Sequence, residues 1–259
     1  MNTFSRIISI SKNTFREAIR DRVLYNLVVF VLLITASAIL LGELTAGNEA
    51  QTIVNVGLAA VLIFGVFIAI FVGVGLVSKE IEKRTLYALL SKPVSRAEFL
   101  LGKYFGLCLT LLVNVLIMGG GITLALLYVG GGNLIASAWY AVILIYFELT
   151  IVTAIALMFS SFSTPALSAL LTFLIFVIGH LSTTLRELAQ TFSGVATRFF
   201  VNAVYYLLPN LKNFEFATNA SHGEVPSSRF FFGAVLYAIV YVAIIISLSI
   251  IIFSRKNLK

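Results

Sequence analysis

The stretch KEIEKRTLYALLSKPVSRAEFLLGK, residues 79–103, is the only long and densely charged segment in a chain that otherwise passes from one apolar block to the next. Six of the 18 Lys and Arg residues fall within it. Such a segment must stay in water, and its excess of basic residues indicates the cytoplasmic side of a membrane. We therefore expect a cytoplasmic loop here, and we look for the function of the chain there first.

The composition of the whole chain is that of a membrane protein with several spans. Hydrophobic residues make up 60% of its 259 residues and charged residues only 11%, which a soluble globular domain does not show. A spanning helix needs roughly 20 mostly apolar residues. The sequence predicts an all-α fold with six spans in one membrane domain over residues 1–259. The expected spans are residues 23–41, 53–78, 104–128, 138–160, 165–185 and 230–254.

The distribution of basic residues predicts the orientation of these spans. The N-terminal stretch, the loop between spans two and three and the C-terminal tail together hold 14 Lys and Arg residues, against four on the opposite side. This bias places both termini in the cytoplasm of a multi-pass protein of the cell (inner) membrane. The net charge of +7 is then mainly a topology signal. Anionic lipid headgroups are the expected partner of this charge, and nucleic acid is not.

Two segments outside the spans are predicted to lie flat. In residues 1–22 apolar and basic side chains fall on different faces of a helix, as in an interfacial amphipathic helix on the inner leaflet. The apolar face holds Phe4, Ile7, Ile8, Phe15 and Ile19, and the basic face holds Lys12, Arg16 and Arg20. A simple topology anchor is the alternative. Within the long outer segment, residues 186–229, the aromatic stretch 198–210 predicts a short helix at the outer interface, or plain lipid contact.

The charged loop itself is predicted to contain a short transverse helix. Ser78 is a candidate N-cap, and the helix should end near Ser91 because Pro93 disfavours helical backbone before it. Ser95 and Glu98 then have the spacing of a capping box that begins the third helix. That helix would be about 50 Å long at the standard rise, against roughly 30 Å of hydrocarbon, so its first turns should stand in the cytoplasm. A stiff lever is the expected result; a snorkelling loop without a partner is the alternative.

This loop resembles the first cytoplasmic loop of the type-2 exporter permeases of ATP-binding-cassette (ABC) systems. The matching residues are Glu80, Glu82, Thr85, Leu86, Leu89, Leu90, Pro93, Val94, Ser95, Arg96, Glu98, Gly102 and Lys103. Arg84 stands where the common pattern has Gly, so we expect a more continuous helix in this chain. The outer stretch LLPNLKNFEF, residues 207–216, resembles permeases grouped with multicopper-enzyme maturation and gliding motility.

The resemblance implies a non-catalytic permease subunit whose residues 79–95 form a coupling helix for a separate ABC ATPase. The residues that it implies for this contact are Glu80, Glu82, Thr85, Leu86, Leu89, Leu90, Pro93, Ser95, Arg96 and Glu98. Two ATPase copies and a second permease half, in a homodimer or a heterodimer, are expected. ATP and Mg²⁺ would bind to the ATPase, and no cofactor is expected in this chain.

Motifs for catalysis or metal binding are not found in the sequence. A phosphate-binding loop needs the GxxxxGK[ST] spacing, but Ala97 stands at the upstream Gly position and Tyr104 follows the only Gly-Lys pair. HExxH, GxSxG and paired Cys motifs are also missing. The single Cys108 excludes an intrachain disulfide and a cysteine-clustered metal site. The sequence therefore gives no support for an enzyme.

Glu148 and His180 are ionisable residues inside predicted spans, where they usually mark a site. Their helices meet at the turn before Pro165, where Thr164 could cap the fifth helix, and the helical rise gives the two residues a depth offset of about 6 Å. They could pair directly or through water. We favour a hydrogen-bonded pair that fastens two helices over a polar contact in the translocation path. The three glycines at 119–121 indicate a kink or hinge in the third span.

Two functions are compatible with these patterns. The first is a permease in which ATP-driven closure of the ATPase pair pushes the loop helix, tilts spans two and three and opens a pathway for an unknown cargo. The second is a membrane subunit that transports nothing and transmits this force to an extracytoplasmic partner protein through residues 186–229. An ion-coupled carrier is disfavoured, because Glu148 is the only clearly buried carboxylate available for coupling.

Overall fold

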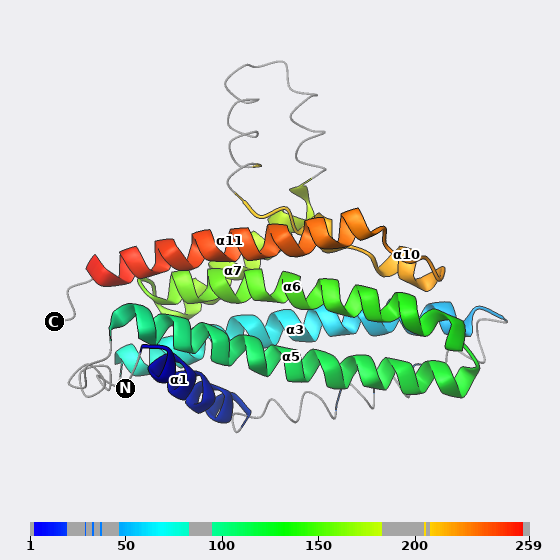
Figure 1. Cartoon of the computed structure of the whole chain (residues 1–259), viewed down its shortest axis with the longest axis horizontal. Coiled ribbons are helices and arrows are strands. Elements are labelled where there is room, and N and C mark those ends of the chain that lie inside the picture. The colour runs from blue at the N-terminus through cyan, green and yellow to red at the C-terminus, as the bar shows by residue number, and fades with distance from the viewer. Residues whose placement is uncertain are drawn as a thin grey trace, which may run out of the picture.

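In the parts that it describes, the computed structural model of the chain is a bundle of helices without strands. The described residues are 3–19, 29, 33, 37, 47–82, 95–182, 205 and 208–255. The elements are α1 (Thr3–Ala18), α3 (Glu49–Glu82), α5 (Arg96–Val129), η2 (Gly132–Leu134), α6 (Ile135–Ser160), α7 (Pro165–His180), η3 (Leu211–Phe214), α10 (Ala217–Ser221) and α11 (Ser228–Arg255). Figure 1 shows α3, α5, α6 and α11 running along the long axis of the bundle.

Four of these helices are long and apolar enough to cross a membrane, and they correspond to four of the six predicted spans. They are α3, α5, α6 (extended by η2) and α11. The predicted fifth span corresponds to α7, which has only 16 residues and ends at His180 rather than at residue 185. The predicted first span, residues 23–41, lies almost entirely outside the described residues.

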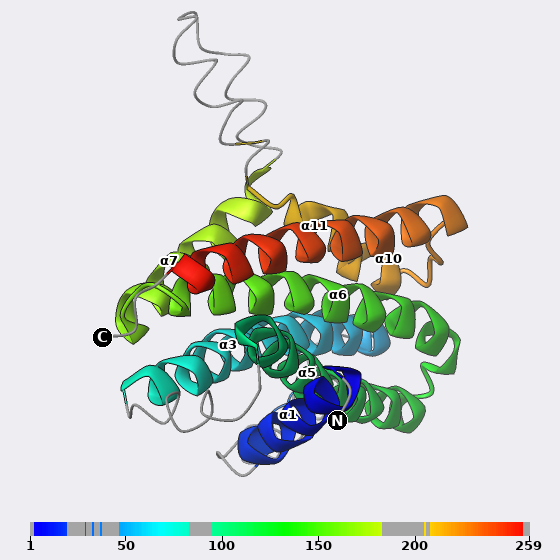
Figure 2. The same cartoon turned by 60° about the vertical axis from the view of Figure 1, so that its left-hand side comes forward.

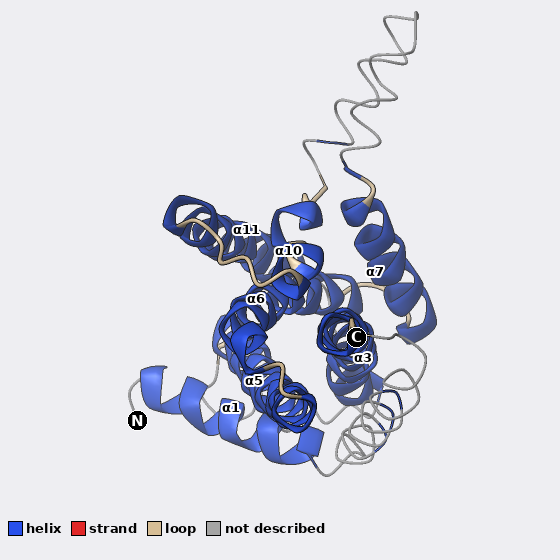
Figure 3. Cartoon of the chain, turned by 90° about the vertical axis from the view of Figure 1, so that its right-hand side faces the viewer, coloured by secondary structure: helices blue, strands red, loops and turns tan. Residues whose placement is uncertain are grey.

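Helix α6 forms the centre of the bundle. It contacts α3, α5, α7 and α11, and Figure 3 shows it lying among α3, α5 and α11 in a view along the bundle. Of the most apolar 18-residue stretch of α6, 72% is buried inside the bundle, against 22% of the corresponding stretch of α11. This fits the sequence of α6, which is apolar on all sides, as expected of a helix that is covered by neighbours all round.

The second span does not end where the sequence analysis placed its boundary. Helix α3 continues through Ser78 to Glu82, so Ser78 does not begin a separate helix, and that prediction is wrong. No Gly or Pro follows Gly75 before residue 82, and the Lys and Glu residues there favour a helix, so nothing in this stretch stops α3. Residues 83–94, the remainder of the predicted coupling helix, lie outside the described residues.

The third span agrees closely with its prediction. Helix α5 has 34 residues and begins after Ser95, and Gly130, with φ 79°, ends it in the left-handed conformation that glycine adopts without strain. Helix α5 is assigned without a break through Gly119–Gly121, and the predicted kink or hinge there stays a prediction. Gly119 allows close packing, since a Cβ atom there would lie 3.2 Å from the Trp139 ring.

The described part of the outer segment, residues 208–227, is hydrogen-bonded to α6, to α11 and to Ser182, which follows α7. The Ser182 hydroxyl donates to Asn210 Oδ1 at 2.7 Å, and the Tyr237 hydroxyl of α11 accepts from the Asn210 amide at 2.9 Å. At its other end the Ser137 hydroxyl of α6 donates to the Ala220 carbonyl at 2.8 Å. The predicted interfacial helix, residues 198–210, lies mostly outside the described residues.

Candidate functional site

The start of α5, directly after the charged loop, is held by the predicted capping box. The Glu98 amide donates to Ser95 Oγ at 3.1 Å, and the Ser95 amide donates to Glu98 Oε2 at 2.8 Å. These two bonds satisfy two amides that would otherwise have no partner at a helix N-terminus. Any displacement of the loop is therefore applied to a helix with a fixed first turn.

Arg96 joins the start of α5 to the end of α11. Its Nη1 atom donates to the carbonyls of Phe253 and Ser254 at 2.8 and 3.0 Å, two of the groups that a helix C-terminus leaves without intrahelical partners. A positive charge at this end also interacts favourably with the helix dipole. The rings of Phe99 and Phe253 stack beside it, with centroids 6.2 Å apart.

The N-terminal helix α1 is tied to the same end of α5 by polar contacts. Arg6 lies 3.6 Å from Glu98, and Lys103 lies 3.6 Å from Glu17. The Ser11 hydroxyl donates to the Gly102 carbonyl at 3.1 Å. Lys103 is only 2% exposed, so its charge is held inside the protein beside α1.

Two glycines of α5 allow α1 to approach closely. A Cβ atom on Gly102 would lie 2.6 Å from the Ile10 side chain, and one on Gly106 would lie 2.6 Å from Thr14 Cβ. Small residues at a spacing of four are typical of closely packed membrane helices. Figure 2 shows α1 lying against α5. The predicted amphipathic helix exists, but one of its sides contacts protein, while Phe4 and Ile8 remain exposed by 74% and 50%.

The structure places only some of the residues predicted for the ATPase contact. Glu80 and Glu82 lie in the last turn of α3, and Ser95, Arg96 and Glu98 make the contacts described above. The remaining five lie outside the described residues: Thr85, Leu86, Leu89, Leu90 and Pro93. Contact of this set with an ATPase stays a prediction.

Sequence reasoning did not identify three residues of this junction: Arg6, Glu17 and Lys103. The available signals were the position of Lys103 directly before an apolar span and the Gly102 and Gly106 pair beside it. Neither signal indicates which helix packs against this part of α5. The pairing with α1 depends on tertiary packing.

Glu148 and His180 are brought together, as the sequence predicted. His180 Nε2 of α7 lies 3.3 Å from Glu148 Oε1 of α6, and His180 Nδ1 lies 3.3 Å from the Phe176 carbonyl. Glu148 is 1% exposed. The N-cap position of α7 is occupied by Thr164, with Pro165 next to it, but the Thr164 side chain makes no capping bond, which corrects that prediction.

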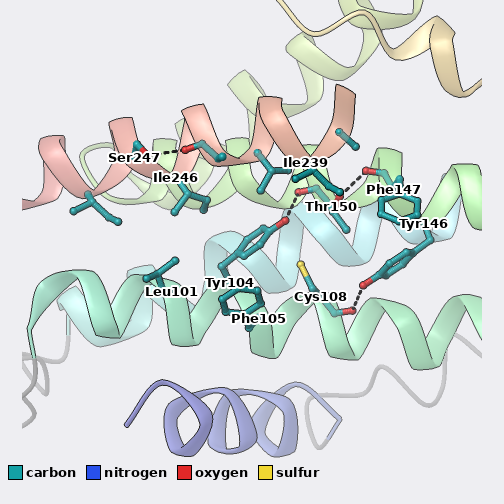
Figure 4. Close-up of a pocket in the computed structure, with 14 residues that line it drawn as sticks. Leu101, Tyr104, Phe105, Cys108, Tyr146, Phe147, Thr150, Ile239, Ile246 and Ser247 are labelled. Carbon is teal, nitrogen blue, oxygen red and sulfur yellow. Dashed lines mark hydrogen bonds between the residues drawn. The ribbon is translucent and has the colours of Figure 1, made fainter. Parts of the chain in front are cut away.

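A recess of about 580 Å³ lies between α5, α6 and α11 (Figure 4). Its lining is mostly apolar. Within it the Tyr104 hydroxyl donates to the Thr150 carbonyl at 3.5 Å, and the Tyr146 hydroxyl donates to the Cys108 carbonyl at 3.4 Å. Cys108 is buried and free of a disulfide. Neither Glu148 nor His180 lines the recess, so the recess and that pair are separate features.

Comparison with known proteins gives one family. A search of curated proteins found no significant match. A family model described as an ABC-2 family transporter protein matches residues 8–258, which include most of α1, the charged loop and every described span. That range is nearly the whole chain, and the chain therefore belongs to the ABC-2 family of transporter membrane proteins.

Proposed function

We propose that this chain is the permease subunit that moves a substrate across the membrane with ATP hydrolysed by a separate ATPase subunit. The observation that carries the proposal is the junction at the start of α5. One capped helix emerges from the charged loop and is fastened by Arg96 to α11 and by ion pairs to α1. A push on the loop would move these three helices together.

The partners follow from this mechanism. Two ATPase copies, which bind ATP and Mg²⁺, would dock on residues 79–95 at the cytoplasmic face of the cell (inner) membrane. A second permease half, identical or different, would complete the pathway. Leu86, Leu89 and Leu90 supply an apolar contact surface for the ATPase, since apolar side chains on a cytoplasmic loop gain from burial against a partner.

The test is to express the chain with the ATPase encoded beside it and to measure association and ATP turnover after reconstitution. Leu86→Asp with Leu89→Asp should abolish co-purification, because each change places a charge in an apolar contact. Leu86→Met with Leu89→Met is the matched control and should bind normally. Association of the Asp variant at the wild-type level would refute the docking assignment.

A second candidate function is force transmission to an extracytoplasmic partner without transport. The described outer segment favours it, because residues 208–223 are fixed to α6 and α11 and would move with them. Reconstitution separates the two functions. Transport of a lipid or small molecule that stimulates ATP turnover supports the permease, whereas turnover stimulated only by a secreted partner protein supports force transmission.

A further inference from the structure

The recess between α5, α6 and α11 has the surface of a hydrocarbon-binding site. Helices α5 and α11 form its walls and α6 its base, as Figure 4 shows. The lining residues are Leu101, Tyr104, Phe105, Cys108, Tyr146, Phe147, Thr150, Ala238, Ile239, Val242, Ala243, Ile246, Ser247 and Ile250. Its volume of about 580 Å³ falls within the roughly 300–1,000 Å³ of small-molecule pockets.

The polar groups of the recess are bonded within the protein. The hydroxyls of Tyr104 and Tyr146 donate to backbone carbonyls across the recess. The hydroxyls of Thr150 and Ser247 donate to carbonyls of their own helices, at 2.6 Å and 2.7 Å. The protons of these hydroxyls are already donated, so a hydrogen-bond acceptor on a ligand would find no donor among them. An apolar ligand would leave no polar group without its bond.

The length of the recess fits one leaflet of a bilayer. On α11 the lining extends from Ala238 to Ile250, which at 1.5 Å per residue is about 18 Å along the helix. One leaflet contributes about half of the roughly 30 Å hydrocarbon core. The lining residues lie in the first half of α5, at the middle of α6, and from the middle of α11 toward its C-terminal end, so in the proposed orientation the recess extends from the bilayer centre into the inner leaflet.

The recess opens sideways and is closed at one end. Its rim residues Phe105 and Ile239 are 52% and 56% exposed, so the rim is continuous with the apolar outer face of α11, the least buried of the four spans. Beyond Ile250 the stacked rings of Phe99 and Phe253 join α5 to α11. A molecule could therefore enter from the side, where hydrocarbon surrounds the protein.

We propose that this recess binds one acyl chain of an inner-leaflet phospholipid. A flexible chain without polar atoms can fill an uneven recess that is about one leaflet long and open to the lipid. The bound chain would fill the space between α5 and α11, two helices that Arg96 joins at their cytoplasmic ends. The proposal does not depend on ATPase coupling.

Native mass spectrometry of the purified chain, released from mild detergent, tests this site without the ATPase. The groove variant is Ala243→Trp with Ser247→Trp, which places two large rings in the recess from exposed positions of α11. The control is Ile244→Trp with Leu248→Trp, at exposed positions of α11 that do not line the recess. We expect wild type and control to retain one phospholipid per chain, and occupancy in the groove variant to fall at least about tenfold.

Two further measurements keep the proposal open to refutation. If both Trp variants unfold at the same temperature, then a loss of bound lipid in the groove variant does not come from a loss of folded protein. In a Cys108→Ser background, Ser247→Cys should form no disulfide between chains, whereas efficient cross-linking would show that a second copy covers the recess and would overturn the proposal. Equal lipid retention by both Trp variants, no retained lipid in wild type, or retention of free fatty acid alone would also overturn it.

Discussion

Arg96 makes a connection between helices that can be tested with a single substitution. Arg96→Ala removes two hydrogen bonds from a charged donor to the end of α11, and bonds of this kind contribute about 1.5–3 kcal/mol each. We expect the last turn of α11 to fray and its amides to exchange hydrogen at least about tenfold faster. Hydrogen exchange with mass spectrometry in detergent measures this directly.

The control for Arg96 removes a charge from the same region without removing the contact. Arg255→Ala changes an exposed residue at the end of α11 and should leave exchange in the preceding turn nearly unchanged. Arg96→Lys should restore only part of the protection, because an ammonium lacks the planar fork of the guanidinium. Equal exchange in Arg96→Ala and wild type would show that the contact contributes nothing to the end of α11.

The Glu148 and His180 pair gives a second prediction at this scale. Glu148→Leu should lower the free energy of unfolding by about 1–3 kcal/mol, because it leaves a half-buried imidazole without its partner. Glu148→Gln keeps a polar oxygen beside the His180 ring and should preserve both stability and transport. Thermal unfolding in detergent and activity of the reconstituted complex with its ATPase are the measurements.

A double-mutant cycle separates the two interpretations of this pair. If the pair fastens α6 to α7, Glu148→Leu and His180→Leu together should cost less than the sum of the single changes. If instead the carboxylate acts in a translocation path, Glu148→Gln would be folded and bound to the ATPase but inactive. The second result would overturn our interpretation.

At the scale of helices, the packing of α1 on α5 depends on Gly106. Gly106→Leu would place a Cβ atom 2.6 Å from Thr14 Cβ and 2.7 Å from the Ser11 carbonyl oxygen, and backbone cannot move aside easily. Overpacking of this kind typically costs about 1–3 kcal/mol. We expect α1 to detach, which faster hydrogen exchange and faster proteolysis within residues 3–18 would report.

A matched control for this prediction lies on the same helix. A Cβ atom added to Gly120 would meet no described atom within 4 Å outside its own stretch of helix, so Gly120→Leu should leave α1 protected, and leucine favours helix more than glycine does. If Gly106→Leu and Gly120→Leu give the same exchange in α1, then close approach at Gly106 is not what holds α1 in place.

The sequence predicted best the features that depend only on residues close together in the chain. The capping box at Ser95 and Glu98 was correct because both of its bonds form within one turn. The boundary at Ser78 was wrong because a residue suited to an N-cap also fits inside a helix when no breaker accompanies it. A two-residue capping box therefore identified a helix start, whereas a single residue suited to an N-cap did not.

Contacts between distant segments could be predicted only where chemistry restricted the choice. Glu148 and His180 were paired correctly because few ionisable groups occur in the spans and a short turn joins their helices. Arg96 and Lys103 had many potential partners, and their contacts with α11 and α1 follow from how the helices pack. Prediction of the recess would likewise have required knowledge of how three helices pack together.

For the whole molecule, the orientation in the membrane is the expectation on which the proposed mechanism depends. Lys12 on α1 and Lys212 in the outer segment are both exposed, and the described spans place them at opposite ends of the bundle. The excess of Lys and Arg on the side of α1 predicts that this side is cytoplasmic. The ATPase can reach the loop only if that prediction is correct.

Labelling of single cysteines in intact cells tests the orientation. In a Cys108→Ser background, Lys212→Cys should react with a membrane-impermeant maleimide added outside the cells, and Lys12→Cys should react only after the membrane is opened. The Cys108→Ser chain without a new cysteine contains no thiol and serves as the blank. The reverse pattern would place the charged loop outside the cell, where an ATPase has no access to ATP, and would exclude coupling through residues 79–95.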